Sequence, residues 1–325
     1  MRFSRLGILF LIVASVLAGS SCGYYNRIMS RKDLVDGSTA YRERKFAQAE
    51  ELFRKAAARD PKGDTVEGKT AQVFLARTLH SRFIGNRQET QLAESAIAEY
   101  QKALTLNPND QSSYKAVASL YDNLQKTDEW QKWVTDRSAN SSIEPHFRAE
   151  ASTALAARQN TCSNDISDTD ATKKTVKSAD GKEVYQFVKP ADQAEFDKMK
   201  QCVTKGQQLI EQAVSAEPDS VKNATSTDLK SLTDEQLRQL LEAVKIFESA
   251  RSYRASLAIQ ASRLAEMEGR AADRDKLKTD ADSYRKDYTD LSEANRNIQG
   301  EIDARRAAAE AAANANANAS SNAAK

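Results

Sequence analysis

The stretch that decides the fold runs from Gly37 to Pro61 and reads GSTAYRERKFAQAEELFRKAAARDP. It predicts two short helices. Small residues at Gly37 and Ala49 would let these helices approach closely, and Pro61 would end the second helix. Aromatic side chains are expected to fill the seam between the two helices: Tyr41, Phe46 and Phe53. The stretch therefore predicts a helix pair with a close backbone crossing.

The same spacing recurs downstream. Four positions of the first pair (Ala49, Phe53, Ala56 and Pro61) are matched by Ala96, Tyr100, Ala103 and Pro108. This pattern resembles the tetratricopeptide repeat (TPR), in which a unit of about 34 residues folds as an antiparallel helix pair. The resemblance implies an all-α fold, a TPR-type α-solenoid of about four to five helix pairs. We expect it to carry a small β-hairpin insertion and a C-terminal capping helix.

The resemblance also implies where the repeats lie. They are expected near residues 30–63, 68–109, 110–143 and 145–219, with a divergent repeat at 233–270. Pro61 and Pro108 are 47 positions apart, which exceeds one repeat, and we assign the excess to a long loop around Ile84 to Gln91. In the third unit Val117 and Ala118 take the expected places, but Trp130 replaces the small residue of the second helix.

An insertion, residues 161–193, is predicted inside the fourth helix pair. Cys162 and Cys202 lie near its two ends. In an exported protein these residues predict a disulfide; the alternative is two free thiols. Within the insertion, β-prone runs flank Asp180-Gly181, which predicts a hairpin with strands over 172–177 and 183–188.

The C-terminal third is expected to be helical. In 233–270 apolar residues recur at steps of three and four, from Leu237 to Met267. In 271–306 a seam from Leu277 to Ile302 alternates steps of four and three, as in a coiled coil. It predicts a helix that caps the solenoid, or else a docking face for a partner or a second copy. Residues 307–325 are almost all Ala, Asn and Ser, and we expect them to be mostly disordered. The Ala-rich start could prolong the preceding helix, whereas residues 314–325 cannot build a core.

The N-terminus has the features of an export signal. A basic start precedes residues 6–17, which are apolar throughout but too short to span a bilayer. Ala18-Gly19-Ser20-Ser21 then precede Cys22 and resemble the lipobox of bacterial lipoproteins. The resemblance implies a lipoprotein signal peptide (1–21), lipid attachment at Cys22 and a tether (22–29).

Gly19 stands where the lipobox usually has Leu, so ordinary cleavage after Ser20 and an uncleaved anchor stay open as alternatives. Gly23 follows Cys22, where lipoproteins of the inner membrane often carry Asp. We therefore expect a lipid anchor in the outer membrane, facing the periplasm of the cell envelope. The alternative is a soluble secreted or periplasmic protein.

Composition excludes several functional classes. Removing Arg2 and Arg5 from the 48 Lys and Arg leaves 46, equal to the 46 Asp and Glu, so nucleic-acid binding through bulk charge has little support. The chain has two His and three Cys, and no phosphate loop, zinc-ligand spacing or nucleophile motif. We expect no enzyme, no metal and no cofactor.

Binding is the remaining class. In the TPR family the first helices line a concave wall that binds peptides or helices. Seven residues are expected to face this wall: Tyr41, Arg42, Arg77, His80, Lys115, Asn123 and Arg148. Four of them are cationic, which predicts a preference for acidic or carboxylate-bearing segments; the alternative is a set of solvated charges without a groove. Leu34 and Ser38 replace the Lys and Asn of the carboxylate-clamp subset, which argues against clamp-type recognition.

These observations predict a membrane-anchored scaffold that recruits unidentified envelope proteins or peptides. A more specific alternative is a component of outer-membrane β-barrel assembly, since the chain resembles the TPR lipoprotein of that machinery. The insertion and the Ala/Asn tail depart from that pattern. A passive envelope spacer is a further alternative.

Overall fold

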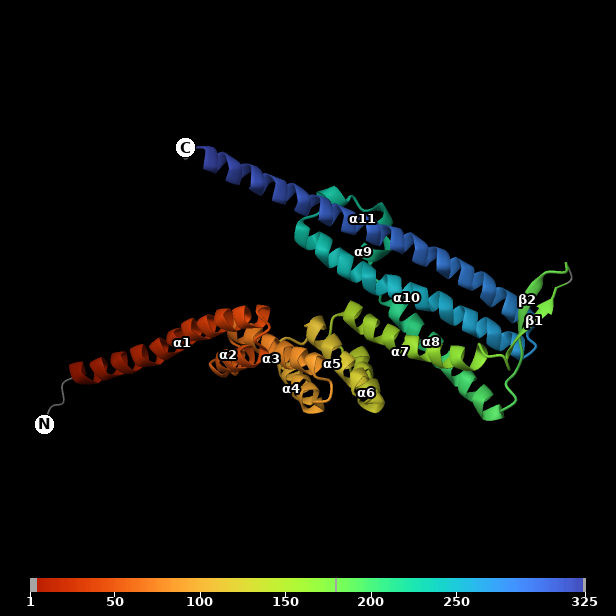
Figure 1. The fold of residues 1–325 in the computed structure, drawn as a ribbon, viewed down its shortest axis with the longest axis horizontal. Coiled ribbons are helices and arrows are strands. Elements are labelled where there is room, and N and C mark those ends of the chain that lie inside the picture. Colours follow the sequence, from red (N-terminus) through yellow and green to blue (C-terminus); the bar gives the residue numbers. More distant parts are fainter. Residues whose placement is uncertain (1–4, 179, 324–325) are drawn as a thin grey trace. The chain divides into compact units, whose positions relative to one another are not determined.

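The computed structural model describes the backbone of residues 5–178 and 180–323, and the side chains of 23–178 and 180–315. The chain divides into two compact units, Met1–Trp133 and Val134–Lys325. The described residues are helical except for loops and one small antiparallel sheet (Figure 1). The expected all-α class with a β-hairpin is therefore confirmed.

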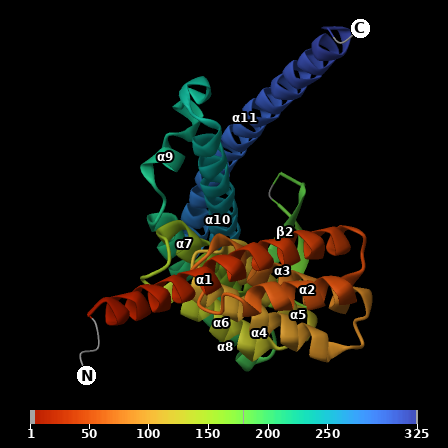
Figure 2. The ribbon, with the colours of Figure 1, turned by 90° about the vertical axis from the view of Figure 1, so that its left-hand side faces the viewer.

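The first unit is a succession of helices that pack against their neighbours in sequence. They are α1 (Arg5–Arg42), α2 (Phe46–Ala58), α3 (Val66–Gly85), α4 (Thr90–Leu106), α5 (Gln111–Asn123) and the start of α6 (Thr127–Ala139). Each helix from α1 to α4 contacts the next one, and α1 also contacts α3 (Figure 2). This order places α1, α3 and α5 as the first members of successive pairs.

The crossing of α1 and α2 is as close as the sequence predicts. A Cβ atom added to Gly37 would lie 2.8 Å from the ring of Phe53, which is fully buried. Phe53 also packs against Phe74 of α3, with ring centroids 5.3 Å apart. Ala49 is completely buried in the same cluster. In α5, by contrast, Ala118 is only half-buried and Val117 fills the core.

The extra length of the second pair lies in its helices and not in a loop. We expected a long connection around Ile84 to Gln91, but α3 runs to Gly85 and α4 starts at Thr90. The helices are 20 and 17 residues long, against 13 for α2. The additional residues extend the two helices, because their helix propensity is sufficient. The expectation of a long loop was therefore wrong.

The N-terminal segment forms one continuous helix, α1. Helix α1 passes through residues 22–29, where we expected a tether. The side chain of Cys22 and those of the predicted signal peptide lie outside the described residues. Among the described helices, none has both the length and the apolar character that crossing a membrane requires.

The second unit is built mainly from four helices of 23 to 53 residues. Helix α7 (Pro145–Ser167) and α8 (Gln193–Ser215) flank the hairpin of β1 (Lys173–Lys177) and β2 (Glu183–Phe187). A short helix α9 (Asp219–Lys222) and two 3₁₀ turns, Ala224–Ser226 and Leu229–Ser231, lead to α10 (Asp234–Met267) and α11 (Ala271–Ala323). Helices α7 and α8 pack together, α10 packs on both, and α11 runs along α10 (Figure 1).

The hairpin and the disulfide are present as predicted, but the insertion is smaller. Strands β1 and β2 pair antiparallel, with Val176 opposite Val184. Cys162 and Cys202 form a disulfide, with Cα atoms 6.1 Å apart. Since α7 continues to Ser167, the first part of the expected insertion 161–193 is helical, and Cys162 lies within α7.

The C-terminal third differs from the expected fifth repeat. Helix α10 is one unbroken helix of 34 residues, without the turn that a helix pair within 233–270 would need. Its capping box, Thr233 with Gln236, starts the helix, and Gly269 with a φ of 75° ends it. The seam of α11 is buried at Ala281, Leu291 and Ile298, and α11 packs on α10. The seam is therefore covered by α10 at these positions and is not an open docking face there.

The Ala-rich tail is helical in the structure. Helix α11 extends to Ala323, although we expected mostly disorder after residue 306. Alanine has the highest helix propensity of all residues, so a chain already helical at Arg306 continues without needing a core. The side chains of residues 311–315 are exposed.

Candidate functional site

Six of the seven predicted wall residues lie in the first unit, on α1, α3 and α5. We call this set the first-helix wall: Tyr41, Arg42, Arg77, His80, Lys115 and Asn123. The seventh, Arg148, lies on α7 in the second unit. Its Nε atom is buried and has no hydrogen-bond partner among the described residues. The candidate site is therefore built from the first unit alone.

Side-chain hydrogen bonds connect the helices of the wall. The hydroxyls of Tyr41 and Ser81 lie 2.8 Å apart and join α1 to α3. Arg77 donates from Nη2 to the Ser112 hydroxyl at 2.9 Å and joins α3 to α5. These two bonds link α1 to α3 and α3 to α5 through residues of the predicted wall or their partners.

The charge of Arg77 is held in place. Its guanidinium lies over the ring of Phe74, 5.4 Å from the centroid. Cation–π contact and the bond to Ser112 restrict the rotamers of a side chain that would otherwise be mobile. An acidic ligand would therefore meet a positioned cation and not a freely moving one.

Asn123 and His80 are already engaged. Asn123 accepts a hydrogen bond from Arg87 Nη1 at 2.6 Å, at the far end of α5. His80 lies beside Tyr100, with Nδ1 3.4 Å from the phenol oxygen. Burial, aided by the positive charge of Arg87, lowers the pKa of His80, which favours its neutral form. His80 therefore adds polarity to the wall but no charge near neutral pH.

A pocket lies at the end of the wall where α1 turns into α2. Its volume is about 510 Å³, and the side chains of the α1–α2 turn and the end of α3 line it: Tyr41, Arg42, Arg44, Phe46, Ser81, Ile84 and Gly85. Arg42 and Arg44 are exposed at its edge, and Tyr41 and Phe46 stack edge to face with centroids 5.4 Å apart. The pocket offers an apolar floor and two cations, a combination that fits an apolar side chain next to a carboxylate.

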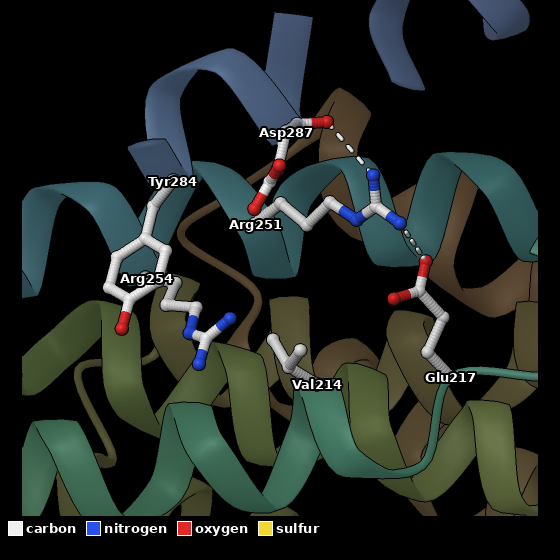
Figure 3. Close-up of a pocket in the computed structure, with 6 residues that line it drawn as sticks. All are labelled: Val214, Glu217, Arg251, Arg254, Tyr284 and Asp287. Carbon is white, nitrogen blue, oxygen red and sulfur yellow. Dashed lines mark hydrogen bonds and ion pairs between the residues drawn. The ribbon is translucent and has the colours of Figure 1, made fainter. Parts of the chain in front are cut away.

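A second polar pocket belongs to the other unit. Arg251 donates to Glu217 at 2.7 Å and to the Asp287 carbonyl at 2.9 Å (Figure 3). Arg254 forms a two-pronged bond to Glu211 and lies 4.0 Å from the centroid of the Tyr284 ring. Because both guanidiniums are satisfied within the protein, this pocket of about 210 Å³ joins α8, α10 and α11 and is not a candidate site.

Sequence reasoning missed the residues that make the wall a unit. Phe74, Ser81 and Ser112 are the partners of predicted wall residues, and Arg44 adds a cation to the pocket. The lateral contacts join residues 35 to 40 positions apart, and no local pattern marks such pairs.

The described residues contain no group of three or more His, Cys, Asp or Glu arranged to hold a metal ion. The first-helix wall provides hydrogen-bond donors, aromatic faces and positive charge. Comparison with known proteins adds no identity: no protein-family model matches the chain, and a search of curated proteins finds no relative.

Proposed function

We propose that this protein is a membrane-anchored, TPR-like scaffold of the bacterial cell envelope. It recruits envelope proteins by binding acidic segments along the first-helix wall. The observation that carries the proposal is the hydrogen-bonded array of α1, α3 and α5, which ends in a pocket with Arg42 and Arg44 at its edge. A connected surface with positioned cations is what an extended acidic peptide requires.

The successive packing of α1 to α5 and the close crossing at Gly37 support a TPR-like arrangement. Lipid attachment at Cys22 and a place in the outer membrane are the parts of the proposal that rest on sequence. Mass spectrometry of the mature N-terminus tests them directly, because a diacylglyceryl group on Cys22 has a defined mass.

Binding is tested with immobilised acidic peptides that carry one apolar residue. In the variant Arg42→Glu/Arg44→Glu, both cations of the pocket are reversed while the core stays intact, since both side chains are exposed. We expect at least about a tenfold loss of affinity, because two charge-assisted bonds become repulsive.

The matched control is Lys55→Glu/Lys62→Glu, with the same charge change on the exposed surface of α2 and the loop after it. If both variants lost the same affinity for the acidic peptide, the first-helix wall would be rejected as the binding site, and non-specific charge attraction would explain the binding. Absence of any peptide binding, together with no defined partner in a pull-down from envelope extracts, would favour the passive spacer.

A further inference from the structure

One face of α1 exposes large apolar side chains close to the predicted anchor. Among the described residues, eight large apolar side chains are classed as exposed, and four of them lie within twelve positions of α1. Their exposed fractions are 71% for Tyr24, 60% for Tyr25, 50% for Ile28 and 57% for Val35. An apolar cluster of this kind, left open in a charged chain, indicates an interaction surface.

The four side chains share one side of the helix. Ile28 follows Tyr24 by four residues, and Val35 follows Ile28 by seven, so these residues lie above one another on a helix of 3.6 residues per turn. The opposite side is buried at Ser30, Gly37 and Ala40, where α1 packs on α2. The apolar side chains are therefore not part of the core of the first unit.

Cations accompany this apolar face. Arg31 and Lys32 lie between Ile28 and Val35, and both are exposed. Lys32 pairs with Asp36 at 3.0 Å, but both side chains are so open that the pair is weak. Asp33, which directly follows Lys32 in the sequence, is buried and accepts a hydrogen bond from Arg59, so its charge is not on the exposed face. We call the exposed face, made of Tyr24, Tyr25, Ile28, Arg31, Lys32 and Val35, the α1 stripe.

We propose that the α1 stripe lies on an anionic phospholipid surface. Tyrosine side chains suit the boundary between headgroups and acyl chains, apolar side chains enter it, and Arg and Lys attract anionic headgroups. The stripe follows Cys22 and the apolar residues 6–17 on the same helix, and it spans only about 17 Å. Figures 1 and 2 both show this end of α1 projecting beyond α2.

Charge favours a lipid surface over a second copy of the chain. Two copies joined through this face would bring Arg31 and Lys32 of each copy close together, and like charges repel. The inference goes beyond the proposed function, because it concerns the open face of α1 and not the first-helix wall. It predicts that the membrane restrains the first unit as well as tethering it.

The test places an environment-sensitive fluorophore on single cysteines in the full chain with Cys22→Ser. Cys162 and Cys202 form a disulfide and do not react. Labels at Ile28→Cys and Val35→Cys report on the stripe. The control label is placed at Lys55→Cys on α2. The neighbouring residue, Ala56, accepts a hydrogen bond through its carbonyl from the Ser30 hydroxyl at 3.0 Å. Position 55 therefore lies beside the part of α1 between positions 28 and 35.

The chain is reconstituted in vesicles of phosphatidylcholine, with and without phosphatidylglycerol. With phosphatidylglycerol, we expect blue-shifted emission and quenching by lipid-borne quenchers at positions 28 and 35, but not at 55. Arg31→Gln/Lys32→Gln should lower the ratio of docked to free stripe by roughly thirtyfold. Added salt should act in the same direction.

Three results would overturn the proposal. In the first, the emission and quenching of the labels at 28 and 35 would match those of the label at 55. In the second, these two labels would respond in phosphatidylcholine vesicles as strongly as in vesicles that contain phosphatidylglycerol. Alternatively, they would shift with protein concentration when no vesicles are present, which would assign the stripe to a second copy. None of these measurements depends on peptide binding at the wall, so the two proposals fail independently.

Discussion

The two units of this chain stabilise helices in different ways. In the first unit, helices α2 to α5 have 13 to 20 residues and pack on their neighbours in sequence, and aromatic rings such as Phe53 and Phe74 fill the seams. In the second unit, helices of 23 to 53 residues are joined by contacts between distant positions. Ser167, for example, donates to Gln260 in the core, 93 residues away. The first unit is therefore held by contacts between consecutive helices, whereas the second unit also depends on hydrogen bonds between residues far apart in the sequence.

Arg305 shows how the second unit makes such cross-links. From α11 it donates to the carbonyls of Leu232 and Leu229 at 2.8 and 3.0 Å, and to Asp234 at 3.0 Å. These carbonyls belong to the irregular segment before α10, which has few regular backbone bonds of its own. One planar guanidinium therefore holds the start of α10 against α11.

The largest effect should come from removing the disulfide. Cys162→Ala/Cys202→Ala opens a loop whose ends are 40 positions apart, which should cost about 4 kcal/mol of unfolding free energy in the chain-entropy model. Hydrogen exchange followed by mass spectrometry should show faster exchange in α7 and α8, with α2 to α4 unchanged. Equal acceleration in α2 to α4 would show that the units do not unfold separately, and the comparison between them would fail.

Glycine substitutions compare the helix crossings of the two units. Gly37→Ala would force a Cβ atom against the buried Phe53 ring, which has no room to move. We expect a loss of about 1–3 kcal/mol in unfolding free energy, despite the better helix propensity of alanine. At Gly206 the nearest atom, 2.5 Å away, is a terminal methyl carbon of Leu257, which is buried as well. A branched aliphatic side chain can shift its end by a change of rotamer more easily than an aromatic ring can shift as a whole, so Gly206→Ala should cost less.

Gly300→Ala is the matched control for both substitutions. Gly300 lies within α11, and among the described residues an added Cβ would meet nothing within 4 Å beyond its chain neighbours and the local helix backbone. Alanine should raise the unfolding free energy there by up to about 1 kcal/mol. Thermal denaturation of the three variants gives the order of the changes in unfolding free energy. A larger loss at Gly206 than at Gly37 would mean that the aromatic seam is not the tighter crossing.

Local sequence signals predicted the parts of the fold that depend on neighbouring residues. The Gly37 crossing, the strands on either side of Asp180-Gly181 and the disulfide were all predicted correctly. The crossing and the hairpin depend on side-chain size and turn chemistry, which are visible in a short stretch, and the disulfide joins two cysteines at the ends of one predicted insertion. Helix length is different, because the end of α3 and the unbroken course of α10 depend on the summed propensity of many residues.

The candidate site was only partly predictable for a related reason. Spacing predicted Arg77 and Tyr41 as wall residues, but it gave no sign of the side chains that they bond, because Ser112 and Ser81 are ordinary polar residues of other helices. Arg148 was assigned to the same wall because the repeat spacing was extended beyond the first unit. The structure places it in the second unit, on α7, a helix of 23 residues.

The smallest effect concerns His80 and sharpens the view of the wall. Burial, followed by the charge of Arg87, lowers the pKa of His80 in the folded state. The unfolded chain therefore binds the proton more tightly. Stability is complete above the ordinary histidine pKa and declines as the pH falls from there through the folded pKa. Proton NMR of the imidazole should give a midpoint below the ordinary value, and His80→Gln should remove this part of the pH dependence. A midpoint at or above the ordinary value would place an additional cation on the first-helix wall at mildly acidic pH, and affinity for acidic peptides should then rise as the pH is lowered.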